Sequence, residues 1–166
     1  MAVIGEDWAH EGWDAAGDEA ALLPHFASWA AAARALLEGA GDWRKWALAA
    51  MAPLPRWGEG RITLLGDAAH PVLPFLAQGG AMAIEDAARL AREVGRGGGL
   101  ARAFERYAQA RGPRTARVQA RSRRQGEIYH MGGLKRLARN LVLGARSPGG
   151  LLKELDWLYR VPMEEA

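Results

Sequence analysis

The sequence contains no cysteine, and this absence excludes several kinds of site. A disulfide scaffold, a thiolate metal site and a cysteine nucleophile all require the thiol group. The four histidines, His10, His25, His70 and His130, are scattered and show no metal-ligand spacing such as HExxH. We therefore expect no metal centre.

The sequence also lacks an apolar run of about 18 residues, the length that a membrane-spanning helix needs. The N-terminal stretch MAVIGEDW has two acidic residues by position seven and no basic segment, which is not typical of a signal peptide. We therefore expect a cytoplasmic protein without a membrane partner. With 166 residues, 49% of them hydrophobic and 25% charged, the composition is typical of a globular domain.

Basic residues are concentrated in one part of the chain. Residues 100–146 contain twelve Lys or Arg and two acids, Glu105 and Glu127, which gives a local net charge of +10. The other residues carry ten basic and seventeen acidic side chains, or −7, so that the whole chain has a net charge of +3. Such a block can bind nucleic acid, form the solvated face of a helix, or contact an acidic partner.

The scarcity of aromatic residues in this block favours a solvated helical face or a contact with an acidic partner. Proteins that bind nucleic acid commonly interleave aromatics with arginines. Tyr107 is the only aromatic residue between Phe104 and Tyr129, and no known nucleic-acid-binding motif occurs there. We expect no nucleic-acid partner, and a surface helix whose arginines face water or another protein. The residues expected to pack this helix are Ala103, Tyr107, Ala110 and Val118.

Hydrophobic periodicity predicts mainly helices. MAVIGEDW starts as an apolar strand at Val3 and Ile4, and RITLLGD is the clearest strand, ending at Gly66. Helices are predicted for residues 22–37, from Gly79 onward, for 100–125 with a break at Gly112–Pro113, for 134–145 and for 151–161. This is too little sheet for a complete α/β domain.

The helix that begins near Gly79 carries an alanine-rich stripe. Glu85 and Arg89 are spaced to form an i,i+4 ion pair on its outer face. Glu85 and Asp86 are adjacent and point about 100° apart, so they do not converge on one substrate atom. We expect Ala83, Ile84, Ala87, Leu90, Ala91 and Val94 to face inward, and Glu85, Arg89, Arg92 and Glu93 to face outward.

One stretch combines several features of a ligand site. In LLGDAAHPVLPFLAQGGAMAIEDAARLA, Asp67 follows a strand and can accept hydrogen bonds from ribose or ribityl hydroxyls. Gly79–Gly80 opens a helix whose free N–H groups and positive dipole end suit negative charge, and lets a planar ligand approach the backbone. Pro71 and Pro74 stiffen the loop between them. A reduced flavin needs three such elements: an acceptor that binds its ribityl chain, a rigid surface beside its ring, and donors that stabilise the negative charge at its N1–C2=O edge.

Each of these residues also has a plainer interpretation. Gly66–Asp67 can be an ordinary turn in which the aspartate caps its own backbone. Gly79–Gly80 alone is more often a loop than a cofactor contact. His70 is more often a packed or hydrogen-bonded histidine than a catalytic base.

The pattern GDAAHPxLPFLAQGxxxAIEDA resembles the second flavin-binding motif of class A FAD-dependent aromatic monooxygenases, in the salicylate hydroxylase-like branch. The flanks PLPRWGEGRITLLGDAAH and RYAQARGPRTARVQARSRRQGEIYH are similar to the family as well, as is WLY near the end. The resemblance covers residues 40–160. It implies an α/β, helix-rich fold of the p-hydroxybenzoate hydroxylase-like (PHBH-like) FAD/NAD(P)-binding type.

The resemblance also implies roles for individual residues. Asp67 would bind the FAD ribityl chain, with Gly66 beside it, and Pro71 would lie against the isoalloxazine ring. His70 and Phe75 would lie near the ring or the substrate, with no catalytic role assigned to either. The backbone N–H groups expected to face the pyrimidine edge of the flavin are those around Gln78, Gly79, Gly80 and Ala81.

The activity implied for the parent family is hydroxylation of a small aromatic acid, with FAD as cofactor and NAD(P)H as reductant. Three family features are missing: the N-terminal βαβ unit with GxGxxG, the arginine that follows it and the central DG motif. The sequence therefore predicts a C-terminal portion. Residues 1–40 would be a remnant of the substrate-binding cap, and 41–166 the C-terminal part of the FAD-binding domain.

Two consequences follow for the chain by itself. We expect it to bind FAD weakly or not at all and to be inactive alone, because the pyrophosphate and adenine sites are missing. We also expect exposed apolar surface and hence self-association, or pairing with an N-terminal half. The alternative is a non-catalytic remnant or an interaction module that needs such a half.

Overall fold

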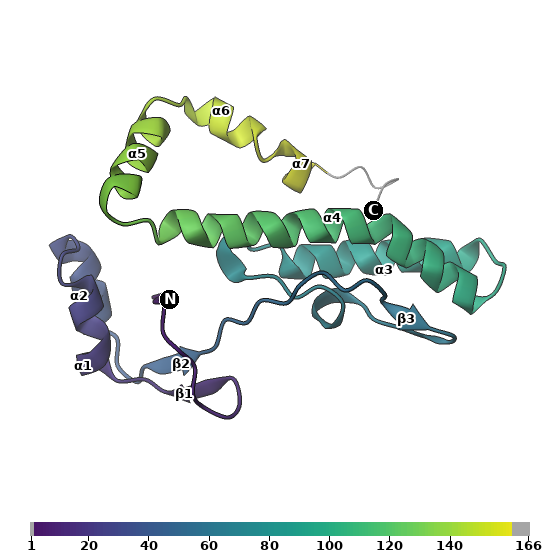
Figure 1. Cartoon of the computed structure of the whole chain (residues 1–166), viewed down its shortest axis with the longest axis horizontal. Helices are drawn as coiled ribbons and strands as arrows, with labels where there is room; N and C mark the ends of the chain where they lie inside the picture. Colours follow the sequence, from purple (N-terminus) through teal and green to yellow (C-terminus); the bar gives the residue numbers. More distant parts are fainter. Residues whose placement is uncertain (1, 161–166) are drawn as a thin grey trace. The chain divides into compact units, whose positions relative to one another are not determined.

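The computed structural model describes residues 2–160, and the chain divides into two compact units, Met1–Ala49 and Ala50–Ala166 (Figure 1). Each unit has its own short antiparallel ribbon, and helices make up most of the second unit. The predicted helix-rich character is confirmed. The strands of the described residues pair only as two two-stranded ribbons.

In the first unit, strand β1 (Asp14–Ala16) pairs antiparallel with β2 (Arg44–Trp46). Between them lie α1 (Glu19–Leu22), the 3₁₀ turn Leu23–Phe26 and α2 (Ala31–Glu38). The side chain of Asp18 caps α1 by accepting a hydrogen bond from Ala20 N at 2.9 Å. Phe26 is the buried hydrophobic side chain of this unit within the described residues.

Two predictions for this unit are wrong. Residues 22–37 do not form one helix, because Leu23–Phe26 forms a separate 3₁₀ turn with Pro24 near its start, and the chain restarts as a helix at Ala31. Val3 and Ile4 do not form a strand. A strand needs a hydrogen-bonding neighbour, and β1 and β2 of this unit pair with each other.

In the second unit, β3 (Gly58–Glu59) and β4 (Ile62–Thr63) form a tight hairpin. The expected strand over RITLLGD is therefore shorter than predicted. Two 3₁₀ turns follow, Gly66–Ala68 and Pro74–Leu76, and lead into α3 (Gly79–Gly95) and α4 (Leu100–Tyr129). The predicted start of α3 at Gly79 is confirmed.

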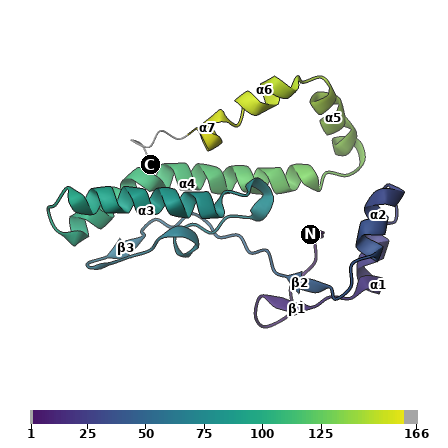
Figure 2. The same ribbon diagram turned by 180° about the vertical axis from the view of Figure 1, so that it is seen from behind.

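Helices α3 and α4 lie side by side in both ribbon views and form the centre of the second unit (Figures 1 and 2). One core cluster, Trp57, Ala69 and Tyr107, lies where the loop before α3 meets α4. A second cluster joins Met82 of α3, Val118 of α4 and Leu158 near the C-terminus. Ala103, Tyr107 and Val118 are buried as predicted.

Helix α4 runs through Pro113 without the predicted break. Proline removes one helical hydrogen bond, but Arg111 and Thr115 on either side of Pro113 are both buried against neighbouring segments. Thr115 Oγ1 also donates to the Gly112 carbonyl at 3.1 Å. The packing of Arg111 and Thr115 therefore keeps α4 continuous past Pro113.

The buried face of α3 is not the predicted apolar stripe. Met82, Asp86 and Glu93 are its buried residues, whereas Ile84 is 74% exposed and Val94 43% exposed. Ala87 and Ala91 are exposed as well. The helix thus turns two carboxylates inward, and α4 supplies arginines that neutralise them.

The remaining helices are α5 (Gly133–Gly144), α6 (Pro148–Lys153) and α7 (Asp156–Tyr159). Arg114 of α4 fastens α7 by donating to the Trp157 and Leu158 carbonyls at 3.0 and 3.1 Å. The Arg117 guanidinium stacks 3.9 Å from the centre of the Trp157 ring. No helix within residues 2–160 is long and apolar enough to cross a membrane.

Candidate functional site

The turn after β4 approaches α3 closely. Gly66 has φ of +60°, and a Cβ at this position would lie 3.2 Å from the Cβ of Ala83. A larger residue would therefore be strained by its backbone and crowded by the helix. Ala69 N and His70 N both donate to the Gly66 carbonyl at 2.9 Å, which closes the turn.

The side chain of Asp86 on α3 forms hydrogen bonds with this turn. Its Oδ2 accepts hydrogen bonds from the backbone N–H of Gly66 at 3.1 Å and from His70 Nε2 at 2.6 Å. Its Oδ1 accepts from Arg111 Nε at 2.7 Å. Because an ionised carboxylate can only accept, Nε2 is the protonated nitrogen of His70. All three side chains are buried.

The ionisation of this cluster follows from its contacts. Burial alone would raise the pKa of Asp86, but hydrogen bonds from His70 and Arg111 outweigh burial and hold that pKa below its usual value. Glu85 has a lowered pKa for the same reason, since burial is outweighed by Arg114 and Arg111. Burial and the nearby Asp86 charge raise the pKa of Tyr107.

Asp67 differs from Asp86 in being exposed and free of ion pairs within residues 2–160. Its Oδ1 lies 3.6 Å from the point where a Cβ of Gly79 would be. The carboxylate therefore stands beside the first residue of α3. No side chain caps that helix, so the N–H groups of its first turn have no side-chain acceptor. Gly80 has open space where a side chain would otherwise be.

Side chains of helix α4 hydrogen-bond to the loop between Gly66 and Gly79. Gln119 Nε2 donates to the Pro71 carbonyl at 3.1 Å, and Ser122 Oγ donates to the Leu73 carbonyl at 2.6 Å. Both side chains are buried, as is that of Gln78 at the N-cap of α3. Pro71 is half-buried. The structure thus brings Gly66, Asp67, Gly79 and the exposed Gly80 and Ala81 to one edge, with a fixed loop beside them.

The side chains of His70 and Phe75 contact the core and α4. His70 is 2% exposed, packs against the Trp57 ring with 5.1 Å between centroids, and is a hydrogen-bonded core histidine. Phe75 packs against Gly126 of α4, where a Cβ would lie 2.5 Å from Phe75 Cε2. Its ring also contacts those of Tyr129 and His130.

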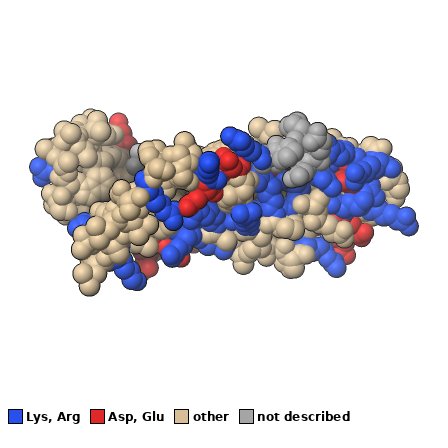
Figure 3. Space-filling model, turned by 90° about the horizontal axis from the view of Figure 1, so that it is seen from above, with Lys and Arg blue, Asp and Glu red and all other residues tan. Residues whose placement is uncertain are grey.

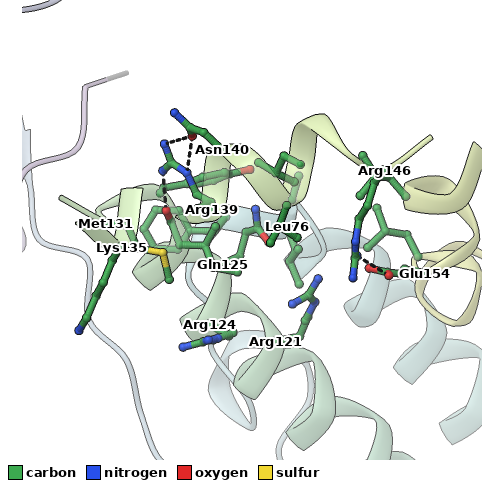
Figure 4. Close-up of a pocket in the computed structure, with 18 of the residues that line it drawn as sticks. Leu76, Arg121, Arg124, Gln125, Met131, Lys135, Arg139, Asn140, Arg146 and Glu154 are labelled. Carbon is green, nitrogen blue, oxygen red and sulfur yellow. Dashed lines mark hydrogen bonds and ion pairs between the residues drawn. The ribbon is translucent and has the colours of Figure 1, made fainter. Parts of the chain in front are cut away.

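Phe75 lines a cavity of about 1040 Å³ between α4 and the C-terminal helices (Figure 4). Its apolar lining includes Leu76, Ile128 and Leu155. Arg146 pairs with Glu154 across one side, and Arg139 donates to the Ile128 carbonyl at 2.8 Å. The basic residues around it are Arg121, Arg124, Lys135, Arg139 and Arg146.

The ion pairs of the α3 carboxylates correct two predictions, the pairing of Glu85 with Arg89 and the outward position of Glu93. Glu85 pairs with Arg114 and Arg111 at 2.7 Å, not with Arg89. Arg89 pairs instead with Glu93 at 2.9 Å. Glu93 is fully buried and also accepts from Arg106 and Arg96.

The arginines of the basic helix are therefore not all in water. Arg111 is 1% exposed, and Arg106 and Arg114 are partly buried against acids of α3. Basic side chains still predominate over acidic ones on the face that Figure 3 shows. The sequence offered one signal for this network: two adjacent acids on a helix that precedes an arginine-rich one.

Comparison with known proteins identifies the family. A family described as FAD binding domain matches residues 10–122. The 3-hydroxybenzoate 6-hydroxylase of Klebsiella oxytoca is 39% identical over 144 residues, which are 86% of this chain and 36% of that protein. The chain therefore spans about a third of the length of such curated relatives.

Solved structures agree. A salicylate hydroxylase substrate complex superposes with a TM-score of 0.77 and 26% identity, covering 96% of this chain and 39% of that one. HpxO of Klebsiella pneumoniae, in complex with FAD and uric acid, also gives a TM-score of 0.77 and 26% identity, covering 87% and 38%. The fold and the sequence thus point to the same group of proteins.

Proposed function

The chain belongs to the FAD binding domain family, among relatives that are flavoprotein aromatic hydroxylases, and we propose that it forms the flavin-ring side of the FAD site. One observation carries the proposal. An exposed, unpaired Asp67 stands beside the uncapped first turn of α3, within the residues that match the family. An acceptor and several donors therefore share one edge, next to glycines that leave room for a flat ligand.

The residues present fit a flavin. Asp67 accepts hydrogen bonds from ribityl hydroxyls, and its carboxylate lies beside Gly79 at the start of α3. The N–H groups of Gly79, Gly80 and Ala81 donate to the electron-rich pyrimidine edge, where the helix dipole adds to the effect. Pro71 forms the wall beside the ring, and Gln78 shapes the N-cap. In this proposal His70 packs in the core and takes no part in proton transfer at the flavin.

In the complete flavoprotein, the proposed reaction is hydroxylation of a small aromatic acid. When bound, FAD supplies the redox chemistry, with NAD(P)H as reductant and O₂ as oxidant. Support comes from the relatives, a 3-hydroxybenzoate 6-hydroxylase and a salicylate hydroxylase. This chain contributes binding and orientation, and we expect it to oxidise no NAD(P)H alone. In this proposal residues 1–40 belong to the substrate-binding cap and 41–166 to the FAD-binding domain.

The test is a titration of the purified chain with FAD, followed by quenching of flavin fluorescence. We expect weak, saturable binding by the wild type and loss of most of that binding in Asp67→Ala. Glu59→Ala is the matched control, since Glu59 is an exposed acid of the β3–β4 hairpin and is not one of the residues proposed to contact the flavin. Equal affinity of Asp67→Ala and the wild type would contradict the proposal and favour a remnant or interaction module.

A further inference from the structure

We propose that Asp86 is the positioning residue of the flavin site, acting through the turn that carries Asp67 and Pro71. This inference rests on the proposed function, because it assumes that the turn faces the flavin. Asp86 itself is fully buried, so in this proposal it acts through the turn and not by direct contact with the flavin. Its role is to set the position of two backbone segments at once.

The geometry connects one carboxylate oxygen to both ends of the turn. Oδ2 of Asp86 accepts from Gly66 N at 3.1 Å and from His70 Nε2 at 2.6 Å. Gly66 directly precedes Asp67, and His70 directly precedes Pro71. A shift of this oxygen therefore moves the ribityl-binding carboxylate and the ring wall together.

Three donors converge on Asp86, and only an ionised carboxylate accepts all of them. The third donor is Arg111 Nε at 2.7 Å, which neutralises the buried charge. An asparagine would present an N–H₂ group to one of these donors, so at least one contact would become repulsive. If Asp86 served only to pair α3 with α4, the contact with Arg111 would be sufficient. The contacts with Gly66 and His70 connect it to the turn as well.

Glu85 supplies the matched comparison. It precedes Asp86 on α3 and also pairs with Arg111, at 2.7 Å. It binds Arg114 through both carboxylate oxygens at 2.7 and 2.8 Å. No contact joins Glu85 to the turn in the part of the chain that the structure describes. Glu85→Gln therefore weakens α3–α4 pairing without touching the turn.

The experiment measures hydrogen exchange of the Gly66 amide by NMR, and flavin affinity by fluorescence quenching, in the whole chain. In Asp86→Asn we expect the Gly66 amide to exchange about tenfold faster and flavin affinity to fall about tenfold, as for one lost hydrogen bond. In Glu85→Gln both values should stay within about threefold of the wild type. Both variants are measured well below their own melting temperatures.

A second pair of variants covers the case in which Asp86→Asn does not fold. His70→Gln keeps an N–H donor toward Asp86 and should preserve flavin affinity, whereas His70→Leu removes the donor and should lower it. Equal affinities of these two variants would overturn the proposal, as would Asp86→Asn and Glu85→Gln behaving alike. If the wild type binds no flavin, the proposed function fails, while the exchange of Gly66 still decides whether Asp86 holds the turn.

Discussion

Asp86 and Arg111 lie 25 residues apart in sequence and form a buried ion pair, with 2.7 Å between Oδ1 and Nε. The two side chains are 0% and 1% exposed. They join the faces of α3 and α4, and Arg111 also contacts Glu85. The helix pair is thus held by charge as well as by apolar packing, and removal of Arg111 would leave the Asp86 carboxylate buried without this cation.

Arg111→Met should destabilise the chain strongly. The substitution leaves Asp86 without its cation, and breaking a buried pair in this way typically costs about 3–5 kcal/mol. Arg102→Met is the control, since Arg102 is exposed on the same helix and its loss should change stability by less than about 0.5 kcal/mol. Urea denaturation followed by circular dichroism measures both. Similar losses in the two variants would contradict the role of Arg111.

Stability should fall in acid because of Asp86. Its pKa is lowered in the folded state, so its stabilising contribution is complete above the unfolded-state pKa of about 3.9. The contribution is lost as pH falls through the lower folded-state value. Urea midpoints measured from pH 7 down to acid should therefore drop below about pH 4. Asp86→Asn should show a shallower drop than the wild type, and parallel curves would refute this assignment.

Gly126→Ala should destabilise the second unit although alanine favours helices. An added Cβ would lie 2.5, 2.8 and 3.1 Å from three atoms of the Phe75 ring, and overpacking of this kind costs about 1–3 kcal/mol. Gly95→Ala, at the end of α3, meets nothing within 4 Å and should stabilise by up to about 1 kcal/mol. Thermal melts of the two variants should move in opposite directions. A gain of stability in Gly126→Ala would mean that Phe75 does not pack there.

The exposed apolar face of α3 should make the chain self-associate. Ile84 is 74% exposed and Ile62, in the β3–β4 hairpin, is 72% exposed. Ile84→Lys should lower the apparent mass in sedimentation velocity at high protein concentration. Gln109→Lys adds the same charge at an exposed position of α4 and removes no apolar side chain, so it should change the mass little. A monodisperse wild-type monomer would contradict this prediction.

Local chemistry was sufficient to predict the turn, the loop and the helix start that make up the candidate site. The glycine pair that starts α3, the proline-stiffened loop and the aspartate at the turn are all adjacent in sequence, and their conformations depend on neighbouring residues. The start of α3 at Gly79 follows from this. The burial of Ala103, Tyr107 and Val118 in α4 follows from helical spacing alone.

Contacts between distant residues could not be predicted in the same way. Hydrophobic periodicity assigns carboxylates to the surface, yet Asp86 and Glu93 are buried because α4 brings arginines to meet them. The expected strand at Val3 and Ile4 failed for a related reason, since a strand depends on a partner that sequence spacing does not show. Phe75 illustrates the same limit, because its place is set by Gly126, more than fifty residues further on.

The most direct test of the central claim compares riboflavin, FMN, FAD and ADP as ligands of the whole chain. If the chain holds the ribityl group and the ring, the three flavins should bind with similar affinity, and ADP should not compete with any of them. Asp67→Ala should weaken all three flavins alike. Absence of saturable binding by every flavin, or competition by ADP, would contradict the claim that this chain forms the flavin-ring side of the site.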